Sequence, residues 1–174
     1  LYSSIVSLVR RIARIRQVGA VSMMTNGMLL SERLIDRLAE AGLSQINISL
    51  NTLDREKGIE LSGRNYNASH VKMMAEYAAA KMDVVIAPVW LRGINDRDVG
   101  DLIDFAKRLK CGMGIQKFVA HKKGKRLVNE VSWEEFSEKL GEWEIKHGMR
   151  LKHEGQGDVR RTKELPMPFR KGDI

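Results

Sequence analysis

Residues 21–34 read VSMMTNGMLLSERL, an apolar stretch that gives way to Thr25-Asn26-Gly27 and then to the start of a helix pattern. Asn and Gly tolerate positive φ, so a tight turn accounts for their presence. The same order, a buried strand that ends in small polar residues before a helix, recurs at residues 45–51 (QINISLN) and 89–95 (VWLRGIN). A turn alone does not account for this recurrence.

Outward from these stretches, helical and strand patterns alternate along residues 1–120. Apolar spacing and end signals predict helices at 4–18 (closed by Gly19), 31–41, 68–81, 96–110 and 133–147, and strands at 20–25, 45–50, 83–91 and 114–119. Strands that alternate with helices of this length are typical of right-handed βαβ units and a parallel sheet. In such folds, closed barrel or open sheet, ligands bind where strands end and helices begin.

Side-chain alternation indicates which residues face that edge. In residues 45–51 the apolar residues share one face of the strand and the polar residues share the other. A structural strand covered on both faces is normally apolar throughout, so the polar face favours a binding site. Uncharged donors and acceptors suit sugar hydroxyls or an amino-acid carboxylate. The candidate binding residues at these strand ends are Thr25, Asn26, Ser49 and Asn51.

Other reactive residue types indicate no catalyst. Arg92, just past its strand, suits a phosphate or carboxylate, although a surface arginine is an equally open interpretation. The four histidines show no metal-ligand spacing. Only His121, which follows the fourth predicted strand, could reach the predicted binding edge. Cys111 follows a helix C-terminus and is expected to be buried and inert. The residues by themselves therefore predict a ligand-binding edge on a parallel α/β fold.

The composition limits the cell compartment and the partners. The chain has 174 residues, a net charge of +8, one cysteine, and no apolar run long enough to cross a membrane. A single cysteine excludes an intrachain disulfide and fits a cytoplasmic protein. The positive charge is either a solvated surface or a footprint for nucleic acid along the basic segments 117–126 and 160–171.

Two longer stretches resemble a known family. Residues 23–64 (MMTNGMLLSERLIDRLAEAGLSQINISLNTLDREKGIELSGR) and 87–107 (APVWLRGINDRDVGDLIDFAK) resemble the third to fifth βα units of radical S-adenosylmethionine (SAM) enzymes. The resemblance is nearest to the GTP-cyclising branch of molybdenum-cofactor synthesis and to predicted archaeal iron–sulfur oxidoreductases. It spans roughly residues 1–120, and rests on three motifs in order: Thr-Asn-Gly, Ser-Leu-Asn and Arg-Gly-Ile-Asn.

The resemblance implies a partial parallel (β/α) barrel of the TIM type that uses SAM and a [4Fe–4S] cluster. The cluster cleaves SAM reductively to a 5′-deoxyadenosyl radical, which abstracts hydrogen from a substrate in an oxidoreductase or lyase reaction. By resemblance, the SAM site is lined by Thr25, Asn26, Ser49, Asn51, Val89 and Gln116, and the substrate is faced by Arg92 and Asn95. Asn51 replaces the aspartate that the family carries.

Two family motifs are absent from the sequence. Neither the CxxxCxxC that holds the cluster nor the Gly-Gly-Glu-Pro of the second strand is present. We therefore expect the chain to be a C-terminal portion of such an enzyme and to be inactive alone. We expect residues 121–174 to form a linker helix and the start of a small β module. The open edge of a partial barrel also predicts self-association.

Three alternatives remain open at this level. The chain is a cluster-free module that binds a nucleotide or SAM, an RNA-binding protein that acts through its basic tail, or an aldolase-type barrel enzyme. RNA binding predicts an affinity that falls steeply with salt. The aldolase interpretation needs a catalytic lysine or metal-binding carboxylates at strand ends, and none is evident.

Overall fold

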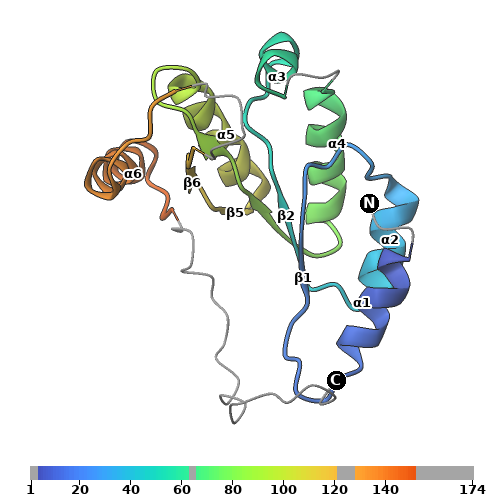
Figure 1. The fold of residues 1–174 in the computed structure, drawn as a ribbon. Coiled ribbons are helices and arrows are strands. Elements are labelled where there is room, and N and C mark those ends of the chain that lie inside the picture. The colour runs from blue at the N-terminus through green and yellow to red at the C-terminus, as the bar shows by residue number, and fades with distance from the viewer. Residues whose placement is uncertain (1–3, 63–65, 121–127, 152–174) are drawn as a thin grey trace.

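The computed structural model describes residues 4–62, 66–120 and 128–151, which form parallel strands flanked by helices (Figure 1). The elements in order are α1 (Ile5–Ala13), β1 (Ser22–Thr25), α2 (Glu32–Glu40), β2 (Gln45–Ile48), α3 (Arg55–Ser62), α4 (Ala68–Ala79), β3 (Asp83–Ile86), β4 (Val89–Trp90), α5 (Asp96–Leu109), β5 (Gly112–Met113), β6 (Gln116–Lys117) and α6 (Trp133–His147). A four-stranded parallel sheet has the order β1-β2-β3-β5, and β4 pairs with β6 in a second parallel sheet. The predicted α/β class with parallel strands is confirmed.

The core lies between the main sheet and the helices, as the alternation in β2 predicts. Ile46, Ile48 and Leu50 are fully buried, whereas the polar residues between them are only half-buried. On the helices, Leu38 of α2 and Val71 of α4 are equally inaccessible. Each such side chain stabilises the fold by about 1.5–3 kcal/mol when it leaves water. The polar face of β2 is thus fixed opposite the helices.

The prediction of one continuous strand at 83–91 is wrong, because this segment forms two separate strands. β3 ends at Ile86 and β4 begins at Val89, with Ala87 and Pro88 between them. Proline lacks an N–H group and cannot donate to a strand ladder. The strand predicted at 114–119 is likewise too long: only β6 (Gln116–Lys117) falls within it, and β5 (Gly112–Met113) lies before it. Beyond β3 and β5 the two segments leave the main sheet, and β4 and β6 pair with each other in the second sheet.

Two helix predictions also need correction. The first helix ends at Ala13 rather than near Gly19, and Ile15 beyond it is 49% exposed. Helices in proteins persist mainly where an apolar face packs, and here that packing stops. α3 has no predicted counterpart because its sequence REKGIELS carries no apolar stripe. Its first turn is instead fixed by Asp54, whose carboxylate accepts a hydrogen bond from the Lys57 backbone N–H at 2.8 Å.

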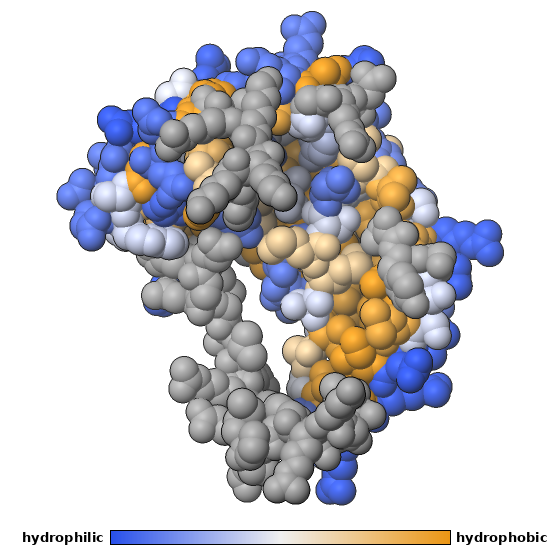
Figure 2. All heavy atoms as spheres, in the orientation of Figure 1, coloured by the Kyte–Doolittle hydropathy of each residue, from blue (hydrophilic) through white to orange (hydrophobic). Residues whose placement is uncertain are grey.

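β1 forms an edge of the main sheet, next to apolar surface. Leu8 and Ile15 on the α1 side are 42% and 49% exposed, and Met24 of β1 is 58% exposed. Figure 2 shows apolar residues gathered over α1 and β1. An unpaired strand edge beside apolar side chains is the feature behind the self-association expected from the sequence, which stays a prediction.

A polar network joins α2 to α4 on the outer surface. The Tyr77 hydroxyl donates to the Asp36 carboxylate at 3.0 Å, and Lys81 Nζ lies 3.0 Å from the same carboxylate. The hydrogen bonds from Lys81 and Tyr77 lower the pKa of Asp36, and the Asp36 contact raises the pKa of Lys81. The network is exposed, so its contribution to stability is small.

Asp36→Asn is expected to lower the urea midpoint of unfolding slightly at pH 7. A carboxyl whose folded pKa lies below its unfolded value stabilises the fold above the unfolded pKa, and the contribution disappears as pH falls through the folded pKa. The gap between wild type and variant should therefore shrink as pH falls below the ordinary value of 3.8. Asp101→Asn on α5 is the control, because that exposed aspartate has no ion pair among the described residues. A gap that does not change with pH would contradict this account.

Candidate functional site

Four residues with small side chains lie side by side at the carboxyl ends of the strands of the main sheet. The backbone pairing of the main sheet continues for one residue beyond the end of each strand. There the N–H groups of residues 49, 87 and 114 each donate to the last residue of the neighbouring strand. We call the residues at this position the edge row: Asn26, Ser49, Ala87 and Gly114. Strand alternation places them on the face opposite Ile48, which the helices cover. Asn26 is exposed, Ser49 and Gly114 are half-buried, and Ala87 is buried. The row offers hydrogen-bonding groups and accessible backbone without a charged or bulky side chain.

The two polar side chains of the Thr-Asn-Gly turn lie on opposite faces of the sheet. Thr25 Oγ1 accepts a hydrogen bond from the Gly27 N–H at 3.1 Å, and Asn26 Oδ1 accepts one from the Met28 N–H at 3.2 Å. Thr25 pairs in register with Ile48, on the helix-covered side of the sheet. The structure therefore brings Asn26 beside Ser49 and gives Thr25 a role in the turn.

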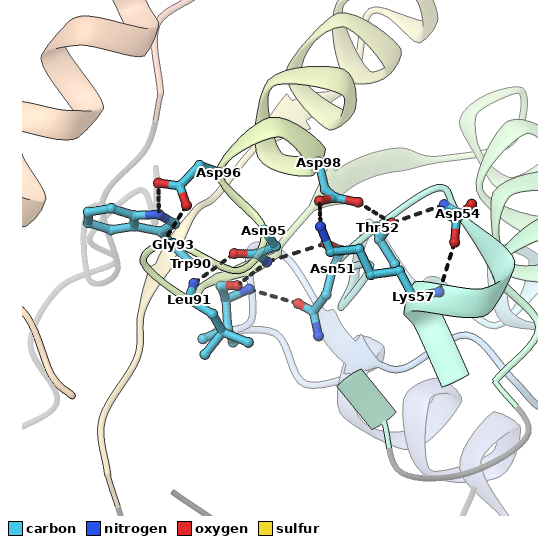
Figure 3. Close-up of polar contacts among 11 residues, drawn as sticks. Asn51, Thr52, Asp54, Lys57, Trp90, Leu91, Gly93, Asn95, Asp96 and Asp98 are labelled. Carbon is cyan, nitrogen blue, oxygen red and sulfur yellow. Dashed lines mark hydrogen bonds and ion pairs between the residues drawn. The ribbon is translucent and has the colours of Figure 1, made fainter. Parts of the chain in front are cut away.

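Asn51 and Asn95 together form what we call the asparagine clamp (Figure 3). Asn51 Oδ1 accepts from the Val89 N–H at 2.9 Å, in place of the ladder bond that the strand break removes. Asn95 is fully buried; its Oδ1 accepts from the Leu91 N–H at 2.7 Å, and its Nδ2 donates to the Val89 carbonyl at 2.9 Å. Nδ2 also lies 3.4 Å from the Asn51 carbonyl oxygen. The amide of Asn95 is thus committed to backbone groups, and its predicted contact with substrate stays untested.

The clamp fixes the position of two other predicted residues. Val89 pairs with Gln116 across the second sheet, and both are half-buried on the same face. The Gln116 N–H donates to the Pro88 carbonyl at 2.8 Å, which extends this pairing back to the strand break. Asn51, Val89 and Gln116 therefore form a neighbouring group, as their joint prediction requires.

Tyr66 reaches the same edge and has no counterpart among the predicted residues. Its hydroxyl donates to the Ser49 carbonyl at 3.3 Å, and burial raises its pKa to about 12. The hydroxyl is therefore a neutral donor at physiological pH. A Cβ at Gly58 of α3 would lie 3.0 Å from the Tyr66 ring, so glycine is the residue that leaves room for the ring. Only the missed helix α3 could have pointed to this contact.

A second missed feature ties α3 to α5. The Asp98 carboxylate accepts hydrogen bonds from Thr52 Oγ1 and Lys57 Nζ, and Thr52 is fully buried (Figure 3). Asp98 lies in the first turn of α5, where a negative charge is also favourable to the helix dipole. The segment that follows Asn51 is therefore anchored, and no local sequence pattern predicts a contact over 46 positions.

Arg92 follows β4 and contacts α6. Its side chain is 62% exposed, and Nη1 lies 2.7 Å from Glu135 Oε1 in the first turn of α6. α6 is held there by aromatic contacts: the ring of Trp90 lies 6.1 Å from that of Phe136 and 5.5 Å from that of Trp143. The helix predicted at 133–147 is thus packed against Trp90 of the second sheet, and its first turn pairs with Arg92, whose predicted contact with substrate stays a prediction.

Metal ligands do not gather in the described part of the chain. No group of three His, Cys, Asp or Glu residues there could hold a metal ion, and His121 lies outside the described residues. Cys111 is buried at the opposite, amino-terminal edge of the sheet, where burial, and secondarily Asp83, raise its pKa. A cavity of about 290 Å³ also lies at that edge, lined by residues that include Gln45, Lys110 and Cys111, and is remote from the edge row. Among the described helices, none is long and apolar enough to cross a bilayer.

Sequence comparison supports one family over most of this region. The profile described as the radical SAM superfamily matches residues 1–106. The whole chain is 34% identical over 202 aligned residues to an uncharacterised protein of Methanocaldococcus jannaschii and covers 47% of that protein. A probable GTP 3′,8-cyclase of Pyrococcus abyssi is 38% identical over 107 residues, which are 62% of this chain and 34% of the relative. The chain therefore spans from a third to about half of the length of these relatives.

Structural comparison agrees on the fold. Streptococcus suis SuiB, solved with S-adenosylmethionine bound, aligns with a TM-score of 0.72 at 16% identity. The alignment covers 88% of this chain and 36% of SuiB. At this identity the likeness establishes the fold, a partial barrel of the same type, and leaves the ligand to be argued from the site.

Proposed function

The chain belongs to the radical SAM superfamily, and from this premise we propose that its carboxyl strand edge binds SAM. The observation that carries the proposal is the edge row, with Asn51, Val89 and Gln116 beside it at the same end of the sheet. SAM presents ribose hydroxyls, an adenine ring and an amino-acid group. Uncharged donors and acceptors fit the ribose hydroxyls, and Asn26 and Ser49 supply such groups in the edge row. The residues of this chain therefore fit SAM.

The cluster does not fit the residues of this chain. A [4Fe–4S] cluster is held by several cysteine thiolates, whereas the sequence has only Cys111. In radical SAM enzymes the cluster supplies the electron that cleaves SAM to a 5′-deoxyadenosyl radical. We propose that the cluster cysteines belong to a part of the enzyme other than these residues. This chain by itself is then expected to bind SAM without cleaving it.

Within the proposed site, each element has a positioning task. Asn26 and Ser49 offer hydrogen bonds to the ligand, while the asparagine clamp holds Val89 against the edge row. Tyr66 fixes the Ser49 carbonyl from the side of α3. Arg92 pairs with Glu135 of α6, and its contact with substrate stays a prediction. The chain thus orients the ligand and shields it from water, and the cofactor carries the chemistry.

The RNA-binding alternative rests mainly on residues outside the described part of the chain. Of the basic segments 117–126 and 160–171, only residues 117–120 belong to the described part of the chain. Lys117 is 7% exposed and its Nζ lies 3.4 Å from Glu130, so it is not a free surface cation. Nucleic-acid binding through the remaining basic residues stays a prediction.

Ser49→Leu is expected to weaken SAM binding at least about tenfold, which equals about 1.4 kcal/mol. The larger side chain fills the middle of the edge row on its accessible face, away from the core. Isothermal titration of SAM into the purified chain measures the change. Ser69→Leu, at an exposed position of α4, is the matched control and should bind like wild type. Equal affinities of Ser49→Leu and wild type, or no SAM binding by wild type, would refute the proposed site.

A further inference from the structure

The first turn of α5 makes a buried polar contact with the segment that follows Asn51. The Asp98 side chain is only 11% exposed, and its carboxylate accepts hydrogen bonds from the Thr52 hydroxyl and from Lys57 Nζ (Figure 3). Thr52 is fully buried, and its hydroxyl oxygen also accepts a hydrogen bond from the Asp54 N–H at 3.0 Å. This one hydroxyl is therefore used as both donor and acceptor, which fixes its orientation.

Thr52 directly follows Asn51, which lines the proposed SAM site. Asn51 Oδ1 accepts a hydrogen bond from the Val89 N–H at 2.9 Å. Residues 49–54 belong to no helix or strand, so hydrogen bonds made by side chains decide the path of their backbone. The backbone at 51–52 is thereby held by Val89 on one side and by Asp98 on the other.

Thr52 is also linked by packing to Ser49 of the edge row. A Cβ placed on Gly58 of α3 would lie 3.7 Å from Thr52 Cγ2 and 3.0 Å from the Tyr66 ring. Thr52 and Tyr66 therefore both pack against Gly58, and the Tyr66 hydroxyl donates to the Ser49 carbonyl at 3.3 Å. A displacement of Thr52 would therefore reach the group that supports Ser49.

We infer that Asp98 is a positioning residue of the SAM site, which acts through Thr52 and does not itself touch the ligand. This inference rests on the proposed function, in which Asn51 and Ser49 line that site. A carboxylate suits this task because it accepts from two donors at once, and its hydrogen bonds are stronger than those of a neutral group. Lys57 balances the charge that would otherwise be buried alone. Loss of this anchor is expected to weaken SAM binding even where the chain stays folded, because affinity depends on groups held in place beforehand.

The test measures the dissociation constant of SAM by isothermal titration at a temperature where each variant is folded. Asp98→Ala and Thr52→Val should each weaken SAM binding about three- to tenfold. Thr52→Val keeps the shape of the side chain and removes only its hydroxyl, so it tests the inference even if Asp98→Ala does not fold. Thr52→Ser restores the hydroxyl and should bind SAM within about twofold of wild type. The double variant should bind no more weakly than the weaker single variant, because both substitutions remove the same contact.

Two controls separate positioning from a general loss of stability. Asp101→Ala removes an exposed carboxylate from α5 and should bind SAM like wild type. Val9→Ala removes buried methyl groups from α1, which contributes no residue to the site, so it should lower stability and leave SAM affinity unchanged.

Wild-type affinity in Asp98→Ala or Thr52→Val, an equal loss of affinity in Val9→Ala, or failure of Thr52→Ser to restore binding would overturn the inference. In each of these cases the wild type still binds SAM, so the proposed function stands. Absence of SAM binding by the wild type would refute the proposed function and this inference together.

Discussion

Asn95→Ala is expected to lower the free energy of unfolding by about 2–4 kcal/mol. The side chain is fully buried, and its removal leaves the Leu91 N–H and the Val89 carbonyl without their partner. A buried backbone group without a partner costs about 1–3 kcal/mol. The two losses occur in one loop, so they are not fully additive.

Urea unfolding at pH 7 measures the effect, and SAM titration follows wherever the variant remains folded. SAM binding should weaken as well, because the clamp holds Val89 beside the edge row. Asn129→Ala is the matched control at an exposed position and should stay within about 0.5 kcal/mol of wild type. If Asn95→Ala is as stable as this control, the clamp does not hold the loop.

Gly27→Ala is expected to destabilise the fold by about 2–4 kcal/mol, for two separable reasons. Gly27 has a φ of +77°, which costs an L-residue about 1 kcal/mol. In addition, the new Cβ would lie 2.7 Å from Val71 Cγ1, in the packed core between the turn and α4. A contact this short forces the neighbouring helix or the turn to shift.

Gly93→Ala separates the two contributions. Gly93 has nearly the same φ, +76°, but no other group lies within 4 Å of the point that an alanine Cβ would occupy there. It should therefore lose only the conformational part, about 1 kcal/mol. The double variant Gly27→Ala with Val71→Ala should recover part of the clash, measured as coupling in a double-mutant cycle. Equal losses for Gly27→Ala and Gly93→Ala would show that packing against Val71 is unimportant.

The repeated strand-to-helix pattern determined the fold class from sequence alone, and it predicted that the carboxyl edge of the strands binds a ligand. Period-two alternation in residues 45–51 assigned Ile46 and Ile48 to the core and Ser49 to the opposite face, because strand geometry is local. The helix caps Ser31 and Ser132 were equally predictable, since a cap depends on residues within one turn. Parallel strands then bring their carboxyl ends to one edge, which explains why Asn26 and Ser49 are neighbours.

Only the tertiary structure decided what those residues touch. The commitment of Asn95 to the Val89 carbonyl depends on the strand break at Pro88. The anchoring of Thr52 depends on where the first turn of α5 places Asp98. The contact of Glu135 with Arg92 depends on where α6 docks, through an aromatic cluster far away in sequence. Local patterns encode periodicity and end signals, whereas these partners meet only after the sheet has formed. Sequence thus determined which residues share the carboxyl edge of the sheet, and packing decided which of their side chains are committed to other groups of the protein.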